Sequence, residues 1–286
     1  MNVDQFIEDI QKNQWNVFGV EVYTDGQLSC SYGDTTATRY PVYSATKTIT
    51  SIAAGMAMDD GVLDLERSVL DYLPGEIVAR LPRRQLSAFR PVTIERLLTM
   101  SVVGFPFRPS GESWLTEALE CRISRRCEFD YSNFSAYLVG VAATCALGED
   151  LYNYLQKRLF TPLGIETPPF ARCPDGYFYG ASSMELTVNE LSRVGLLLYS
   201  GGEYNGQRLL SESYVQRATS VQQHNREGGY GYFVWKYRSG FSINGKWKQK
   251  CYVLPEDGLM ITFLSHIEEE NPHLIRSMER NILGIQ

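Results

Sequence analysis

The stretch SATKTITSIAAGMAMDDG, residues 44–61, decides the fold. Apolar residues recur three, four and seven places after Ile49, at Ile52, Ala53 and Met56. This spacing predicts a helix that buries one face. The rest of the chain is therefore interpreted around this helix.

Both ends of the stretch carry further signals. Ser44 opens it, and Gly61 stands where a left-handed cap would end a helix. Lys47 follows Ser44 by three residues, so on a helix the two side chains project from the same side of the first turn. A lysine that burial keeps partly neutral can accept the serine proton, while first-turn N–H groups stabilise an oxyanion. The pattern predicts an acyl-transfer nucleophile, and the alternative is a serine N-cap followed by a surface lysine.

Composition limits the classes of function. A chain of 286 residues can form one large domain or two lobes. The net charge of −6 and the pI near 5.3 give no reason to expect a nucleic-acid partner. The three histidines form no ligand-like pair, so we expect no zinc site.

The N-terminal segment and the cysteines bear on location. The first fifteen residues lack the basic and apolar regions of a signal peptide, and no apolar run reaches membrane-spanning length. The six cysteines include no C-x-x-C pair and are expected to be free thiols in a reducing compartment. We therefore expect a cytoplasmic protein without a membrane span. A secreted protein whose signal peptide has been removed is the alternative.

Strand and helix patterns predict the architecture. A short amphipathic helix is expected near Phe6, followed by a hairpin that turns at Thr24-Asp25-Gly26. Irregular sequence over 105–127 is expected to form a lid or rim over a site. Further helices are expected over 93–100, 134–148, 149–164, 186–202 and 273–283, and further strands over 230–237, 248–255 and 258–266.

Strands at both chain ends, with helices between them, predict that the termini meet in one sheet. We expect an α/β fold of the α+β type, with an antiparallel sheet flanked by helices and an inserted all-helical lobe. The α/β lobe would comprise 1–60 and 190–286, and the helical lobe 61–189. A cleft between the lobes is the expected ligand site, and Ser44 would face it.

Two further motifs carry candidate functional residues. In Asp130-Tyr131-Ser132-Asn133, a tyrosine near a lysine can act as phenolate base or as acid, and an asparagine amide can orient a substrate carbonyl or the lysine. The alternative is a polar loop in which Ser132 or Asn133 caps the next helix. In residues 244–249, NGKWKQ, a strand edge can supply an oxyanion N–H and a cation; the alternative is a basic hairpin tip.

In this order, S-x-x-K, Y-x-N and a lysine-led third motif resemble the penicillin-recognising serine hydrolases, best their class C β-lactamase-like branch. Segments over 61–76, 93–104, 129–140, 159–170, 186–211 and 230–237 extend the resemblance to nearly the whole chain. It implies a β-lactamase/transpeptidase-like fold and a hydrolase without metal or cofactor, acting on a small molecule or short peptide. It leaves the oligomeric state open.

The resemblance also implies roles. Ser44 would be the nucleophile, Lys47 its activating partner, Tyr131 the general base or acid, and Asn133 a substrate-orienting side chain. The backbone N–H groups of Ser44 and of about Gln249 would form the oxyanion hole.

The third motif departs from the family pattern. Lys246 falls at the lysine of K-T-G, but Trp247 and Lys248 replace the threonine and glycine. On an extended strand Lys246 and Lys248 would share one face and bind an anionic substrate group. A register shifted by a residue or more is an alternative. We expect an acyl-enzyme hydrolase of the D-peptidase, esterase or β-lactamase kind, and the alternative is a catalytically weak family member that binds a peptide or small ligand.

Overall fold

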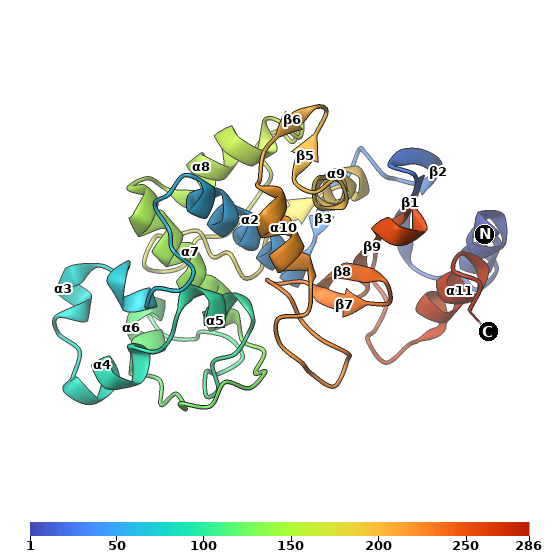
Figure 1. Ribbon diagram of the computed structural model, residues 1–286. Coiled ribbons are helices and arrows are strands. Elements are labelled where there is room, and N and C mark those ends of the chain that lie inside the picture. The colour runs from blue at the N-terminus through green and yellow to red at the C-terminus, as the bar shows by residue number, and fades with distance from the viewer. Residues whose placement is uncertain (286) are drawn as a thin grey trace.

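A six-stranded antiparallel sheet forms one half of the molecule (Figure 1). The computed structural model describes residues 1–285. The strands run in the order β2-β1-β10-β9-β8-β7, so both chain ends contribute to one sheet, as expected. Their bounds are β1 (Val17–Thr24), β2 (Gln27–Gly33), β7 (Trp235–Tyr237), β8 (Gly240–Gly245), β9 (Gln249–Leu254) and β10 (Leu259–Ser265). Two small pairs join β3 (Tyr40–Pro41) to β4 (Glu185–Leu186), and β5 (Glu203–Tyr204) to β6 (Gln207–Arg208).

Helices cover the sheet and form the other half of the molecule. The helix α9 packs on β1, β9 and β10, while α1 and α11 pack together at the end where both termini lie (Figure 1). The bounds are α1 (Val3–Lys12), α2 (Thr46–Asp59), α3 (Gly75–Val78), α4 (Arg83–Phe89), α5 (Ile94–Leu98), α6 (Trp114–Glu120), α7 (Asn133–Leu147), α8 (Leu151–Leu155), α9 (Val188–Tyr199), α10 (Glu212–Thr219) and α11 (His273–Asn281). Single turns are η1 (Tyr43–Ala45), η2 (Val69–Asp71), η4 (Pro255–Asp257) and a π turn, η3 (Gln156–Phe160).

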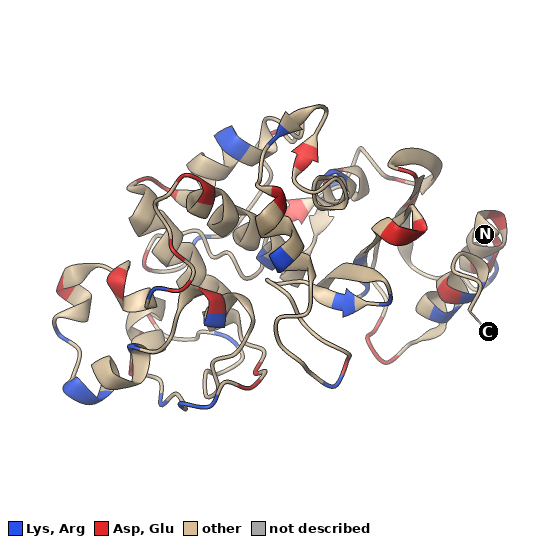
Figure 2. Ribbon diagram, in the orientation of Figure 1, with Lys and Arg blue, Asp and Glu red and all other residues tan. Residues whose placement is uncertain are grey.

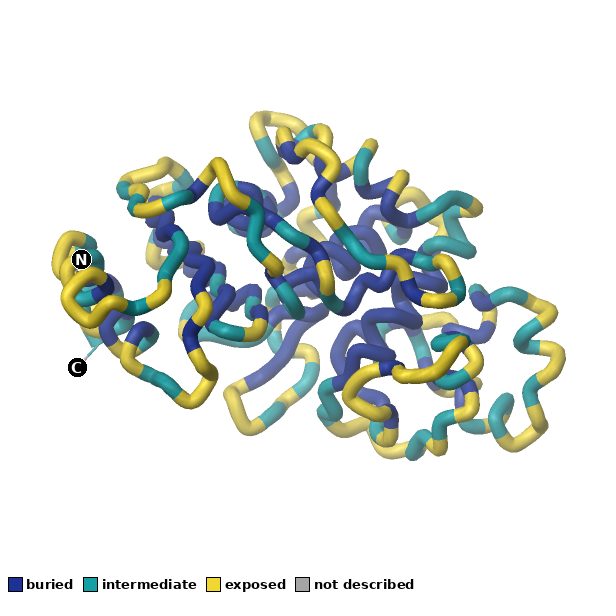
Figure 3. The backbone as a smooth tube through the Cα atoms, turned by 180° about the vertical axis from the view of Figure 1, so that it is seen from behind, coloured by how far each residue is buried: buried dark blue, intermediate teal, exposed yellow. Residues whose placement is uncertain are grey.

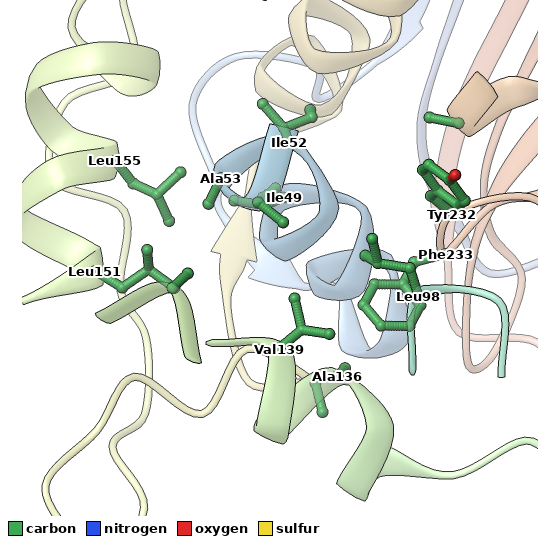
Figure 4. Close-up of a cluster of buried hydrophobic side chains, with 14 of the residues drawn as sticks. Ile49, Ile52, Ala53, Leu98, Ala136, Val139, Leu151, Leu155, Tyr232 and Phe233 are labelled. Carbon is green, nitrogen blue, oxygen red and sulfur yellow. The ribbon is translucent and has the colours of Figure 1, made fainter. Parts of the chain in front are cut away.

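The helix α2 is buried on every side rather than on one face. Each residue from Thr46 to Ala57 is buried, which corrects the expectation of a single buried stripe. Figure 4 shows the reason: α2 lies among side chains of α7, α8 and the segment that carries Tyr232 and Phe233. Gly55 permits a further close contact, because a Cβ there would lie 2.5 Å from a ring carbon of Tyr214.

Several local predictions are confirmed. Asp25 and Gly26 both have positive φ, as a tight hairpin turn requires. Thr93 caps α5, and Thr187 forms a capping box with Glu190 at the start of α9. Buried positions, dark blue in Figure 3, follow the central helices and strands.

Two expectations about elements need correction, and one strand was not predicted. The strand expected over 230–237 is limited to β7, and the region 105–127 contains the helix α6. The strand β8 was not predicted, because its sequence, GFSING, is short and rich in glycine and polar residues. Pairing with β7 and β9 on both sides stabilises it instead.

All six cysteines are free thiols. Acidic and basic residues are spread along the ribbon (Figure 2). Within residues 1–285 no single helix combines the length and apolar composition needed to cross a membrane, although α7 and the segment Leu151–Phe160, bent by 79°, pass that test as a pair. The lobe boundaries and the cytoplasmic location stay predictions.

Candidate active site

Ser44 lies in η1, the single turn that leads directly into α2. The preceding residue, Tyr43, has a φ of 47°, which is uncommon for a residue other than glycine. No side chain caps η1 or α2, so the Ser44 hydroxyl is not used as an N-cap. The alternative of a capping serine is therefore wrong, and the hydroxyl is available to another partner.

That partner is Lys47. Its side chain is only 1% exposed, and its Nζ lies 3.0 Å from Ser44 Oγ. The Nζ also donates to Asn133 Oδ1 at 2.7 Å and to the Ala181 carbonyl at 2.8 Å. Burial lowers the pKa of Lys47 to about 7. The alternative of a surface lysine is wrong as well.

The three partners of Lys47 can accommodate an ammonium, which would donate to all three oxygens, or a neutral amine. A neutral amine has two N–H donors and one lone pair. Asn133 Oδ1 and the Ala181 carbonyl are acceptors that use the two donors, and a serine hydroxyl can donate to the lone pair. The geometry and the lowered pKa therefore both allow a neutral Lys47 near pH 7.

Asn133 reaches Lys47 from the first turn of α7. The preceding Ser132 is the N-cap: its hydroxyl accepts from the Phe134 amide at 3.1 Å. This leaves the Asn133 amide free to donate to the Tyr179 hydroxyl at 2.8 Å while its oxygen accepts from Lys47. The motif thus provides both the cap and the site residue, which the sequence presented as alternatives.

Tyr131 completes the group around Ser44. Its ring centroid lies 4.9 Å from Lys47 Nζ. Burial raises the pKa of Tyr131 to about 12, although hydrogen bonding with the Ser44 side chain opposes this shift. The phenol is therefore protonated at neutral pH, and of the two roles considered for Tyr131, proton donor fits better than phenolate base.

Tyr131 also belongs to an aromatic wall that sequence analysis missed. The ring of Tyr131 stacks with Phe107 at 6.3 Å and with Trp235 at 5.7 Å between centroids, and Phe129 and Tyr230 pack beside them. Because the five rings come from three segments that are distant in the sequence, no single spacing links them.

The third motif does not form an extended strand. Lys246, Trp247 and Lys248 make the turn between β8 and β9, with φ values of 60° at Trp247 and 64° at Lys248. The expectation that the two lysines share one strand face is therefore wrong. The Nζ of Lys246 lies 4.4 Å from the Trp247 ring centroid, and this lysine is exposed.

Lys248 is buried and points elsewhere. Its Nζ donates to the Glu269 carbonyl at 2.6 Å and pairs with a Glu269 carboxylate oxygen at 3.2 Å. The other carboxylate oxygen accepts from the Trp247 amide at 2.5 Å. Glu269, in the segment after β10, thus stabilises the turn. The geometry favours a structural role for Lys248 over contact with a substrate anion.

Gln249 also has structural partners. Its buried amide side chain bonds the backbone of Ser265, and the residue pairs with Gly245 in the hairpin. Gly245 lies against η1, because a Cβ there would be 2.2 Å from the Val42 carbonyl oxygen. The end of β8 therefore reaches the turn that carries Ser44.

Two backbone N–H groups near this contact have no hydrogen-bond acceptor among residues 1–285. They belong to Ser44 and Lys246. These amides flank the contact between η1 and the end of β8. Within the same residues, no three His, Cys, Asp or Glu side chains are grouped as a metal site needs.

Comparison with known proteins identifies the family of the chain. The model of the beta-lactamase family matches residues 4–281. The chain belongs to the beta-lactamase family. Its membership of the class C branch stays a prediction.

Several solved structures have the same fold. A presumed beta-lactamase from Bacteroides dorei DSM 17855 is 18% identical, with a TM-score of 0.78 over 98% of both chains. A presumed 6-aminohexanoate-dimer hydrolase from Bacillus anthracis is 17% identical, with a TM-score of 0.78 over 97% of this chain and 80% of the other. A beta-lactamase from Sulfitobacter sp. EE-36 is 17% identical, with a TM-score of 0.76 over 98% and 95%. At these identities the likeness shows the shared fold alone.

Proposed function

We propose that this member of the beta-lactamase family is a serine hydrolase that forms an acyl-enzyme at Ser44. The observation that carries the proposal is the buried Lys47, whose Nζ lies 3.0 Å from Ser44 Oγ and whose pKa burial lowers to about 7. A buried lysine without a carboxylate partner is costly to a fold, so its place beside a hydroxyl supports a chemical role.

In the acylation step, the Ser44 oxygen attacks the carbonyl carbon of an ester or amide while the hydroxyl proton moves to Lys47 Nζ. The tetrahedral intermediate then expels the leaving group, which takes a proton from the Tyr131 phenol. Tyr131 regains this proton from the Lys47 ammonium, which returns to the neutral amine. Water attacks the acyl carbon in the second half-reaction, with proton transfers in the reverse direction.

The oxyanion would be held by two backbone amides. The sequence placed these at Ser44 and at about Gln249; we propose Ser44 and Lys246 instead. Both amides lack an acceptor, and Gly245 brings the end of β8 against Val42, two residues before Ser44. Removal of an oxyanion donor typically costs about 100- to 1000-fold in rate.

The substrate class is a small amide or ester, as in D-peptidases, esterases or β-lactamases. Asn133 faces Lys47 and Tyr179, so its first role is to hold the lysine, with substrate contact as a second role. The second candidate is a catalytically weak protein that binds a peptide or small ligand, and only the altered turn over 246–248 favours it.

A fluorophosphonate probe, read by mass spectrometry of the labelled peptide, separates these candidates. We expect one covalent label per chain on Ser44 and none in Ser44→Ala. We expect Lys47→Ala and Tyr131→Phe each to slow labelling strongly. Their combined effect should be much smaller than the product of the two, because both residues serve the same proton transfers. Labelling of Ser44→Ala at the wild-type stoichiometry would show that the nucleophile lies elsewhere.

A further inference from the structure

Tyr179 is joined to the proposed base, Lys47, through the side chain of Asn133. The Asn133 oxygen accepts from Lys47 Nζ at 2.7 Å, and the Asn133 side-chain nitrogen donates to the Tyr179 hydroxyl at 2.8 Å. All three side chains are buried. Among residues 1–285, the Tyr179 hydroxyl is the one hydrogen-bond partner of that nitrogen. A single buried amide therefore connects this phenol to the lysine.

The segment that carries Tyr179 is itself fixed against α2. The Ala181 carbonyl accepts from Lys47 Nζ at 2.8 Å, and the Thr50 hydroxyl on α2 donates to the Gly180 carbonyl at 2.7 Å. Gly180 has a φ of 65°, and a Cβ there would lie 2.8 Å from Thr50 Oγ1, so glycine permits this close approach. Three consecutive residues thus contact α2 or the side chain that holds its lysine.

The ring of Tyr179 is held from its other side by α6. Trp114, the first residue of α6, meets the ring edge to face at 4.7 Å between centroids. The carboxylate of Asp175 fixes the start of this helix, because it accepts from the Trp114 amide at 2.7 Å, the Leu115 amide at 3.1 Å and the Ser113 hydroxyl at 2.6 Å. The position of the phenol therefore does not depend on Asn133.

The hydroxyl of Tyr179 is suited to hold an amide beside a lysine. Burial raises the pKa of this phenol, although its hydrogen bond with Asn133 opposes the shift, so the group is neutral at neutral pH. It accepts the amide N–H without placing a charge near Lys47. Without the hydroxyl, the Asn133 nitrogen would be a buried donor that lacks a partner, which is costly. The amide would then be free to turn its oxygen away from Lys47.

We propose that Tyr179 is a positioning residue for the base. Its hydroxyl holds the Asn133 amide with the oxygen toward Lys47, and this contact keeps the Lys47 nitrogen directed at Ser44. The inference rests on the proposed acyl transfer at Ser44, and it adds a residue that acts through Asn133 rather than on the reacting atoms.

Tyr179→Phe removes the hydroxyl and keeps the ring against Trp114. The rate constant for fluorophosphonate labelling of Ser44 should fall by about 10- to 100-fold, as for a small misplacement of a reacting group. The midpoint of its pH dependence should also move to lower pH, because an ammonium that loses an acceptor has a lower pKa. Tyr152→Phe is the matched control, since Tyr152 is 9% exposed against 8% for Tyr179 and donates to the Pro168 carbonyl at 2.9 Å. Its rate and midpoint should match the wild-type protein.

A double-mutant cycle tests whether Tyr179 acts through Asn133. In an Asn133→Ala background, adding Tyr179→Phe should slow labelling by no more than about 2-fold further, because the contact is already lost. Losses that multiply in this cycle would overturn the positioning role and leave the hydrolase standing. A Tyr179→Phe variant with the wild-type rate or an unshifted midpoint would do the same.

Titration of Lys47 by nuclear magnetic resonance separates this inference from the proposed function. In protein made with lysine isotopically labelled at Cε, the Lys47 signal is identified by its loss in Lys47→Arg, and it reports protonation without turnover. Tyr179→Phe should move this titration to lower pH, and Tyr152→Phe should leave it in place. A moved titration in a protein whose Ser44 is never labelled would uphold the positioning role and overturn the hydrolase. A titration that Tyr179→Phe leaves unmoved would overturn the positioning role.

Discussion

At the scale of single residues, the sequence predicted which side chains meet but not their protonation. Ser44 and Lys47 are three residues apart, so a helical turn alone brings them together. The lowered pKa of Lys47 comes from burial by residues far along the chain, among them Asn133 and Ala181, which lie 86 and 134 positions away. No local pattern contains that information. The phenolate role considered for Tyr131 fits less well than the proton-donor role for the same reason, since burial raises its pKa to about 12.

Asn133→Asp tests how Lys47 is kept neutral. A carboxylate 2.7 Å from Nζ would favour the ammonium form and raise the pKa of Lys47 above about 7. Because the neutral amine is the proposed base, the rise of the acylation rate with pH should move to higher pH. The rate of fluorophosphonate labelling, measured from pH 5.5 to 9.5, reads this shift. Asn153→Asp, an exposed change on α8, should leave the midpoint in place, and an unchanged or lower midpoint in Asn133→Asp would contradict the role given to Asn133.

At the scale of elements, the helix cap at Thr187 and the hairpin turn at Asp25-Gly26 were predictable from the sequence. The turn over 246–248 was not. Asp-Gly at 25–26 and the Thr187 capping box act within a few residues. The turn places Trp247 and Lys248 at positive φ, which residues other than glycine rarely adopt. Glu269, in the segment after β10, stabilises this turn. A strand was therefore expected where the structure has a turn.

Gly245→Ala tests the contact between β8 and the nucleophile turn. The new Cβ would lie 2.2 Å from the Val42 carbonyl oxygen, so β8 and η1 must move apart. Overpacking of this kind costs about 1–3 kcal/mol in stability. We also expect slower acylation at temperatures where the protein stays folded, because the Lys246 amide moves with β8. Gly75→Ala is the matched control, since no atom lies within 4 Å of its added Cβ. Equal labelling rates in the two variants would show that the Lys246 amide is not part of the oxyanion hole.

At the scale of the whole molecule, the mixed fold was predictable because strand patterns occur at both chain ends and helical patterns between them. The pairing of β1 with β10 confirms that the ends share one sheet. The core is divided in a way that composition does not reveal. One apolar cluster surrounds α2, and a second lies among α1, α11 and the sheet.

Phe6→Ala tests whether the second cluster stabilises the fold without serving the site. Phe6 is fully buried in that cluster, so its truncation should cost about 3–5 kcal/mol in the free energy of unfolding. Urea unfolding monitored by circular dichroism measures this loss. The labelling rate of Ser44 per folded molecule should stay close to wild type, because Phe6 belongs to a different cluster from α2. A small stability loss together with slow labelling would contradict this division.

The central claim is that a buried, neutral Lys47 activates Ser44, and the pH dependence of Ser44 labelling tests it most directly. Lys47 has a pKa of about 7, and only its neutral form can accept the serine proton. The labelling rate constant should therefore rise with pH, reach half its maximum near pH 7, and stay level up to pH 9.5, because Tyr131 is protonated below about pH 12. A rate that is flat from pH 5.5 to 9.5, or that falls as pH rises through 7, would contradict the account.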